Sequence, residues 1–256
     1  FGADLGAEKF FDIKCRKSGL KPDAVVLVAT TKALKMHGGI KKDDLGSENV
    51  DAVILGCKNL ERHIENIGKF GVPVIVAIND YVSDTEKEHA AIIDYCQNIG
   101  VQCKISSHWE KGGKGAANLA EEVAKIADSN SAEFKTLYDN KMSLWDKTQY
   151  IAQNIYGAAE IIADKKIRNQ FQKLEDDGFG EYPICMAKTQ YSFSTDPLLM
   201  GAPSGHDVPI KEVRLSAGAE FVVVVCGEVM TMPGLPRIPA SENIDVDDNG
   251  LIQGLF

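Results

Sequence analysis

The chain has 256 residues and a formal net charge of -9 at pH 7, an acidity that argues against nucleic acid or an anionic membrane surface as the main partner. Its hydrophobic content of 44% is ordinary for a globular protein, and no apolar run approaches the roughly 18–20 residues of a membrane-spanning helix. The six cysteines form no CxxC pair. This pattern predicts reduced thiols, no zinc site, no disulfide framework and a cytoplasmic location.

The chain begins with a glycine-spaced segment, FGADLGAEKF, that runs into a helix. Gly2 and Gly6 permit close approach of the backbone, and free N–H groups at the start of a helix suit a phosphate. The pattern is compatible both with an anion site and with an ordinary helix start. Because the sequence opens at Phe1 without a methionine, inside this segment, we expect it to be a piece of a longer protein.

Residues 23–29 form an apolar, β-branched run that predicts a strand buried on both faces of a parallel sheet. Residues 30–39 are expected to form a loop at the carboxyl end of this strand. Two interpretations of Lys32, Lys35 and His37 stay open, namely contact with an anionic substrate or a solvated loop. His37 has no partner at metal-ligand spacing, so no metal site is predicted here.

The most informative stretch covers residues 71–115. Residues 72–78 predict a second buried strand, a helix capped by Asp84 or Thr85 follows, and residues 101–105 predict a third strand. Such a strand–helix–strand unit makes its two strands parallel with a right-handed crossover. Both carboxyl ends then lie at the edge of the sheet where open α/β sheets bind ligands.

Two aromatic side chains follow these strand ends. Tyr81 comes after the second strand, and Trp109 falls in an expected loop over residues 106–115 after the third. Aimed into one crevice, the two rings are suited to hold a flat heterocycle between them. Asn79 and Asp80 resemble the base-reading Asn-Lys-x-Asp element of guanine-nucleotide proteins, but the lysine is absent, which argues against that function.

The rest of the chain predicts helices first and strands afterwards, so the whole sequence indicates an α/β fold that ends in a small mixed region. Trp145 falls in a helical zone and is expected in the core. Helical patterns cover residues 50–70, 116–129, 130–138, 144–163 and 167–174. Strand patterns cover residues 182–188, 208–215 and 221–226, and a hairpin is expected to turn at Asn249–Gly250.

Several long and unusual strings are spread over the entire chain. They are FGADLGAEKF from Phe1, VAT and KALKMHGG ending at Gly39, MAKTQYSFS from Met186, GAPSG from Gly201, RLSAGA from Arg214 and MTMPGLP from Met230. With these strings the sequence closely resembles the carboxyl-terminal half of formate–tetrahydrofolate ligases.

The resemblance implies a two-step reaction in which ATP phosphorylates formate, and N10 of tetrahydrofolate then attacks the formyl carbon of formyl phosphate. It also implies Mg²⁺ with ATP, activation by a monovalent cation such as K⁺ or NH₄⁺, and a homotetramer. The implied domains are the end of a P-loop NTPase-like α/β domain over residues 1–63, a second α/β domain with the folate cleft over residues 64–198, and a small mixed domain over residues 199–256.

The resemblance also implies roles for individual residues. The pterin ring in this family stacks between a phenylalanine and a tryptophan, and the matching positions are Tyr81 and Trp109. Phe1 matches another aromatic residue of the folate cleft, Ile105 matches a leucine there, and Lys32 stands where an arginine is common. The loop that borders the nucleotide and formyl phosphate matches Gly2, Ala3, Asp4 and Gly6.

The family's P-loop lysine and the arginine downstream of it are both missing, because the sequence contains no Gly-x-x-x-x-Gly-Lys-Ser/Thr. The catalytic residues are therefore unknown, and two hypotheses remain. The chain is either the carboxyl-terminal part of a working ligase, inactive by itself, or a non-catalytic folate-binding or oligomerisation fragment.

Overall fold

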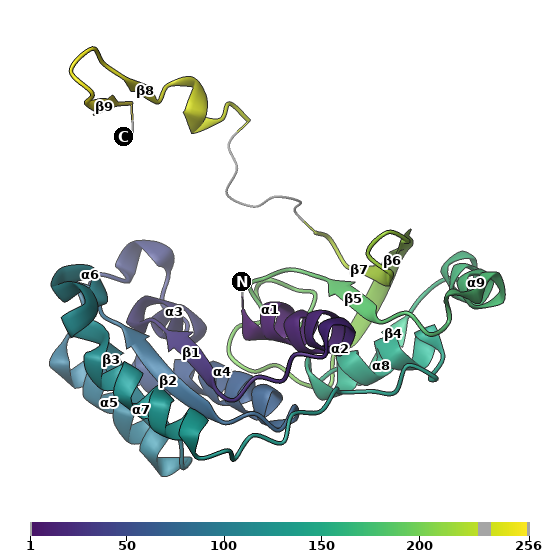
Figure 1. The fold of residues 1–256 in the computed structure, drawn as a ribbon, viewed down its shortest axis with the longest axis horizontal. Coiled ribbons are helices and arrows are strands. Elements are labelled where there is room, and N and C mark those ends of the chain that lie inside the picture. Colours follow the sequence, from purple (N-terminus) through teal and green to yellow (C-terminus); the bar gives the residue numbers. More distant parts are fainter. Residues whose placement is uncertain (1, 230–236, 255–256) are drawn as a thin grey trace.

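The computed structural model describes residues 2–229 and 237–254, whose strands form two main sheets (Figure 1). The first sheet is parallel, in the order β1-β2-β3, and consists of β1 Val25–Ala29, β2 Val74–Asn79 and β3 Gln102–Ser106. The second sheet is mixed, in the order β4-β6-β7-β5, and consists of β4 Glu160–Ile162, β5 Ile184–Ala187, β6 Asp207–Ser216 and β7 Phe221–Cys226. The predicted α/β fold is confirmed.

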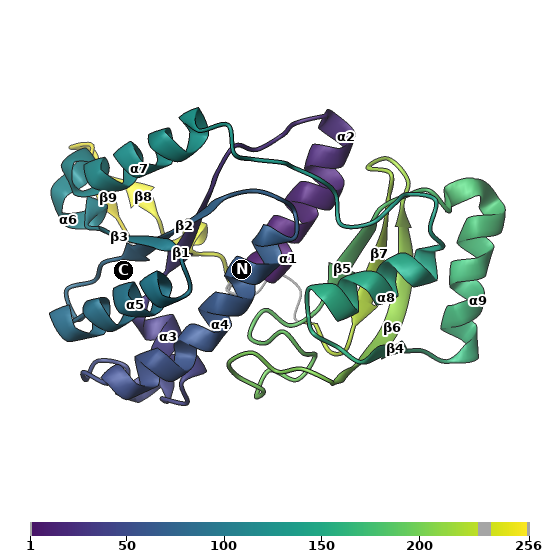
Figure 2. The same cartoon turned by 90° about the horizontal axis from the view of Figure 1, so that it is seen from below.

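Helices α1 and α4 lie side by side between the two sheets (Figure 2). Helix α1 continues through a π-helical stretch, Phe10–Cys15, into α2. The helices with their bounds are α1 Ala3–Lys9, α2 Arg16–Ser18, α3 Thr31–His37, α4 Val50–Gly68, α5 Glu86–Asn98, α6 His108–Lys111, α7 Ala117–Asp128, α8 Leu144–Asn154 and α9 Lys165–Leu174.

The centre of the first sheet agrees with the prediction. Residues 75–78 of β2 are buried on both faces, as expected for a continuous apolar run in a parallel sheet. Thr85 caps α5 in a capping box with Glu88, which decides between the two predicted caps. The parallel crossover from β2 through α5 to β3 is also confirmed.

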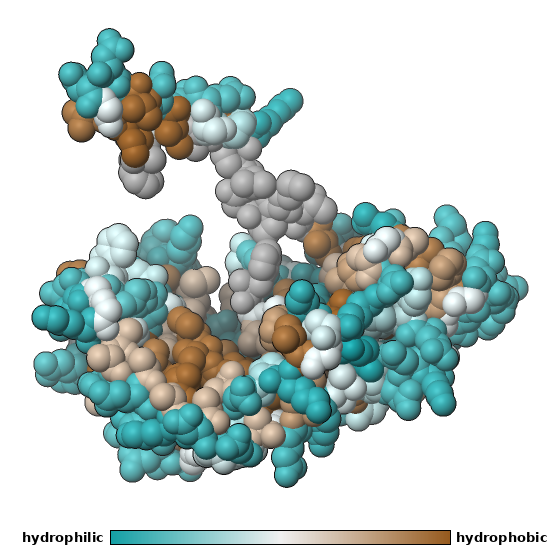
Figure 3. Space-filling view, in the orientation of Figure 1, coloured by the Kyte–Doolittle hydropathy of each residue, from teal (hydrophilic) through white to brown (hydrophobic). Residues whose placement is uncertain are grey.

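Strand β1 is buried on one face only, which corrects the prediction of burial on both. Leu27 and Ala29 are buried, whereas Val26 and Val28 are exposed. Figure 3 shows an apolar surface over this strand. The outer edge of β1 has no strand partner within residues 2–229 and 237–254.

The predicted loop over residues 30–39 is instead helix α3. The Thr30 hydroxyl accepts a hydrogen bond from the backbone N–H of Ala33 and caps the helix. Two glycines then let α3 pack closely on α4. A Cβ on Gly38 would lie 2.0 Å from the Ala52 carbonyl oxygen, and a Cβ on Gly56 would lie 1.9 Å from the Leu34 carbonyl oxygen.

One other predicted helix is too long, and another is absent. Helix α8 ends at Asn154, and Gly157 takes a φ of 70°, so the later residues turn back to form β4. Residues 130–138 contain no regular helix, because their backbone groups bond elsewhere. The Leu137 N–H, for example, donates to the carboxylate of Asp12. Apolar spacing alone did not reveal these competing partners.

The remaining strands and helices occur where the sequence predicts them, including α7, α9 and the three strands β5, β6 and β7. A small hairpin, β8 Asp245–Val246 with β9 Ile252–Gln253, encloses the predicted Asn249–Gly250 turn. The segment Met230–Pro236 lies outside the described residues. None of the described helices is long and apolar enough to cross a membrane.

Both predicted domain boundaries can be located on the helices and sheets of the structure. The boundary at residue 63 lies inside α4, and the boundary at residue 198 lies between β5 and β6 of one sheet. The division into three domains stays a prediction.

Candidate functional site

Tyr81 and Trp109 line one cleft of about 500 Å³ at the carboxyl ends of β2 and β3. Both side chains are open to solvent, with exposed fractions of 43% and 85%. The Lys32 ammonium, from the start of α3, lies 5.1 Å from the centroid of the Tyr81 ring. The arrangement places two aromatic side chains and one positive charge around one space, and the sequence predicts that the two rings hold a flat heterocycle. We call this group the aromatic cleft. It is lined by Lys32, Asn79, Asp80, Tyr81, Val82, Ser83, His108 and Trp109.

The pairing of β2 with β3 places the two loops of the cleft together. Asn79 lies opposite Ser106 in the parallel register, so the chain leaves both strands at the same level. The Asp80 N–H donates to the Ser106 carbonyl at 3.2 Å, and the Ser107 hydroxyl donates to the Asp80 carboxylate at 2.9 Å. The Asn79 amide also donates to the Tyr81 hydroxyl at 3.3 Å.

Trp109 lies in the short helix α6, which corrects the prediction of a loop over residues 106–115. A 3₁₀ turn over Gly112–Ala116 follows it. Ile105 is partly exposed on β3 but does not line the aromatic cleft. Phe1 lies outside the described residues.

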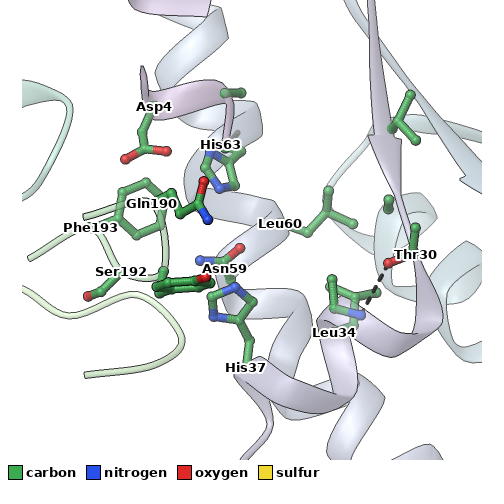
Figure 4. Close-up of a pocket in the computed structure, with 16 residues that line it drawn as sticks. Asp4, Thr30, Leu34, His37, Asn59, Leu60, His63, Gln190, Ser192 and Phe193 are labelled. Carbon is green, nitrogen blue, oxygen red and sulfur yellow. Dashed lines mark hydrogen bonds between the residues drawn. The ribbon is translucent and has the colours of Figure 1, made fainter. Parts of the chain in front are cut away.

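A second, smaller cavity of about 260 Å³ lies beside the starts of α1 and α3 (Figure 4). We call it the histidine pocket. Thr30 and Ala33 line it from the same α3 turn that carries Lys32 into the aromatic cleft, so the two sites are neighbours. It is lined by Gly2, Ala3, Asp4, Val28, Ala29, Thr30, Ala33, Leu34, His37, Asn59, Leu60, His63, Gln190, Tyr191, Ser192 and Phe193.

The first turn of α1 contributes three of the four residues matched to the phosphate loop. Gly2, Ala3 and Asp4 line the histidine pocket, whereas Gly6 does not. Asp4 is buried and forms an ion pair with the buried Lys188, 2.9 Å from its Nζ. The segment is therefore the beginning of a helix whose carboxylate is already neutralised, rather than an open glycine loop.

Both histidines of the pocket are neutral at neutral pH. Burial lowers the pKa of His63 to about 4, and its ring packs 4.7 Å from that of Phe193. Burial also lowers the pKa of His37. The Gly201 N–H donates to His37 Nδ1 at 3.2 Å, which places the imidazole proton of His37 on Nε2.

The charged residues of α3 point in different directions, which the sequence interpretation did not foresee. Lys35 is buried and forms an ion pair with Glu88 at 2.9 Å, so it does not meet a ligand. Lys32 faces the aromatic cleft, and His37 faces the histidine pocket. One short helix therefore supplies residues to two sites and to one structural ion pair.

Sequence reasoning missed the part of the pocket that comes from distant segments. Asn59 and His63 lie one turn apart on α4, and Gln190 and Ser192 belong to the MAKTQYSFS string. In Figure 4 the side chains of Asn59, His63 and Gln190 converge on the space between α3, α4 and the loop, whereas the Ser192 hydroxyl points away from it and donates to the Leu199 carbonyl. The unusual string was a usable signal, whereas the two α4 residues looked like an ordinary polar helix face.

Comparisons with known proteins identify the family of this chain. The family model "Formate--tetrahydrofolate ligase" matches residues 1–256. The chain is similar to formate–tetrahydrofolate ligases from Pelagibacter ubique (58% identity), Granulibacter bethesdensis (60%) and Sinorhizobium medicae (59%) over 256 residues. These matches cover 100% of this chain but 46%, 45% and 45% of the respective relatives. The chain thus spans less than half the length of these proteins.

Proposed function

The chain belongs to the formate–tetrahydrofolate ligase family, and from this premise we propose that it supplies the folate side of an ATP-dependent ligase that makes 10-formyltetrahydrofolate. The observation that carries the proposal is the aromatic cleft. Tyr81 and Trp109 follow different strands, are exposed, and border one space. A pterin ring stacked between them would bury aromatic surface on both of its faces.

The histidine pocket is proposed to hold the formyl group next to the folate. Transfer requires the formyl carbon to reach N10 while phosphate leaves, and a site sheltered from water protects an acyl phosphate from hydrolysis. The neutral His37 and His63 add no positive charge there. The Lys188 ammonium is neutralised by Asp4. We therefore place the charges that neutralise the phosphates of Mg²⁺–ATP and formyl phosphate outside this pocket.

The first sheet is proposed to be the end of a larger P-loop NTPase-like sheet. Its support is the outer edge of β1, which has no strand partner among the described residues, together with the exposed Val26 and Val28, since parallel sheets are ordinarily covered on both faces. Homotetramer formation, activation by a monovalent cation and a cytoplasmic location stay predictions from the family resemblance.

Fluorescence tests the folate site directly, because the chain has only two tryptophans. Trp109 is exposed in the cleft, whereas Trp145 packs edge-to-face on Phe171, 5.5 Å away, beneath the Arg168 guanidinium. Tetrahydrofolate is expected to quench Trp109 and to leave Trp145 nearly unchanged. If Trp109→Phe retains the quenching and Trp145→Phe loses it, the cleft is wrongly assigned.

A second assay separates a working ligase from a non-catalytic folate-binding or oligomerisation fragment. The purified chain, verified by mass, is incubated with ATP, formate and tetrahydrofolate. We expect no 10-formyltetrahydrofolate, because the P-loop lysine is absent from the sequence. A full-length relative serves as the positive control. Turnover by the chain itself, free of full-length enzyme, would show that the missing P-loop is dispensable.

A further inference from the structure

Three potential metal ligands lie close together beside the aromatic cleft, where β2 ends and α5 begins. Asp80 directly follows β2, Asp84 precedes the cap of α5, and His89 lies in its first turns. His89 Nε2 is 3.5 Å from Asp84 Oδ2 and 3.7 Å from Asp80 Oδ1. The Asp-x₃-Asp-x₄-His spacing is no common metal motif, so the sequence did not indicate the cluster.

The spacing of these atoms fits a single small cation. One ligand atom from each residue lies within 4.8 Å of the others. A tetrahedral ion with bonds of about 2.1 Å would hold its ligand atoms about 3.4 Å apart. The two distances from His89 Nε2 are already close to this value, so small side-chain rotations complete the geometry.

An orphaned oxygen points to a ligand independently of the clustering. The Asp84 side chain has no exposed surface. Its Oδ2 accepts the Tyr81 N–H at 3.2 Å, but its Oδ1 has no hydrogen-bond partner in the part of the chain that the structure describes. A buried carboxylate oxygen without a donor is costly. A cation bound by this carboxylate would offset that cost.

We propose that Asp80, Asp84 and His89 bind one divalent transition-metal ion, of the series from Mn²⁺ to Zn²⁺. One imidazole and two carboxylates suit these ions, whereas Ca²⁺ requires six to eight oxygen ligands. Asp80 also lines the aromatic cleft, so a water molecule on that side completes the coordination. The ion ties the loop of Tyr81 to the start of α5 and thereby fixes one wall of the cleft.

Mn²⁺ is the probe of choice, since the free cysteines of the chain compete for softer ions such as Zn²⁺. The purified chain, stripped of metal by a chelator, is titrated with Mn²⁺ in the absence of folate, and free Mn²⁺ is measured by electron paramagnetic resonance. One ion per chain is expected, displaced by Zn²⁺ and not by equimolar Ca²⁺. Because no folate is present, the result is independent of the proposed ligase function.

Variants of the ligands give the decisive comparison. His89→Gln and Asp84→Asn are each expected to weaken Mn²⁺ binding by more than about 100-fold, since the loss of residues that merely orient metal ligands already costs 10–100-fold. Asp94→Asn, an exposed carboxylate on the same helix, is the matched control and should bind like wild type.

Asp80→Ala tests the site without the risk that a buried substitution disturbs folding, because the Asp80 side chain is partly exposed. It is expected to fold normally by circular dichroism and still to weaken Mn²⁺ binding at least tenfold. Absence of saturable Mn²⁺ binding to the wild-type chain would overturn the proposal. So would unchanged affinity in Asp80→Ala, which would mean that the three residues form a hydrogen-bonded group and not a set of metal ligands.

Discussion

Two regions of this molecule use charge in opposite ways. A buried seam along α1 holds charged side chains that are mostly partnered with one another, whereas the aromatic cleft presents exposed rings and the Lys32 ammonium to solvent. The first arrangement stabilises the fold and leaves few charged groups free to contact a ligand. The second contributes little to folding and leaves its surfaces free. The seam consists of Asp4, Glu8, Asp12, Arg16 and Lys188.

Breaking the ion pair of the seam is expected to have the largest effect. Lys188→Met leaves the Asp4 carboxylate buried without its partner, and breaking one side of a buried pair costs about 3–5 kcal/mol of unfolding free energy. Urea unfolding measures this loss. The double variant Asp4→Asn/Lys188→Met should recover much of it, because no charge is then left unpaired. A loss below about 1 kcal/mol would mean that the pair is solvated in solution.

A second test of the seam uses pH. Burial raises the pKa of Glu8 from 4.5 to about 7, so the folded protein holds this proton more tightly than the unfolded chain does. Stability from this group is complete below pH 4.5 and is lost as the pH rises to about 7, by about 3 kcal/mol in total. Burial likewise raises the pKa of Asp12 to about 6.

Glu8→Gln should remove this dependence of the unfolding free energy on pH. We expect the variant to become more stable relative to wild type as the pH rises. Urea unfolding from pH 4 to 8 measures this difference in unfolding free energy. Glu121→Gln, at an exposed position on α7, is the matched control and should follow wild type. Parallel curves for wild type and Glu8→Gln would show that Glu8 is ionised in the folded protein.

The cleft was more predictable from the sequence than the seam, for a physical reason. The strand at residues 74–79 and the cap at Thr85 are local patterns, and parallel pairing then fixes where Tyr81 and Trp109 lie. The seam depends on contacts between distant segments. Lys188 pairs with Asp4 across 184 positions of the chain, and no local sequence pattern near either residue indicates its partner.

The errors in the fold have the same origin. The segment of α3 was expected to be a loop because it follows directly on the carboxyl end of a strand, yet it is helical, and Gly38 at its end lets α4 approach. The spacing of Asp4, Glu8 and Asp12, four residues apart, did place three carboxylates on one helical face. That face is ordinarily solvated, and its burial against β5 could not be read from the helix alone.

In the cleft, the largest expected effect is on binding rather than on folding. Trp109→Ala removes one stacking face, which contributes about 1–3 kcal/mol by analogy with base–aromatic contacts, so the Kd for tetrahydrofolate should rise by about one to two decades. The unfolding free energy should change by less than about 0.5 kcal/mol, because Trp109 is 85% exposed. Isothermal titration and urea unfolding of the same sample test both expectations. A large loss of stability without a loss of binding would reverse the comparison between cleft and seam.

The smallest expected effect comes from Tyr81→Phe. The substitution keeps the ring face and the Lys32 contact, and it removes only a hydroxyl that accepts a 3.3 Å hydrogen bond from Asn79. A long, exposed hydrogen bond contributes about 0.5 kcal/mol, so tetrahydrofolate affinity should fall by about two- to threefold at most. Tyr81→Leu, which abolishes the aromatic face at similar bulk, should cost at least tenfold more than Tyr81→Phe in the same titration. If Tyr81→Phe already loses tenfold, the hydroxyl itself contacts the ligand, and the ring does not act as a stacking surface alone.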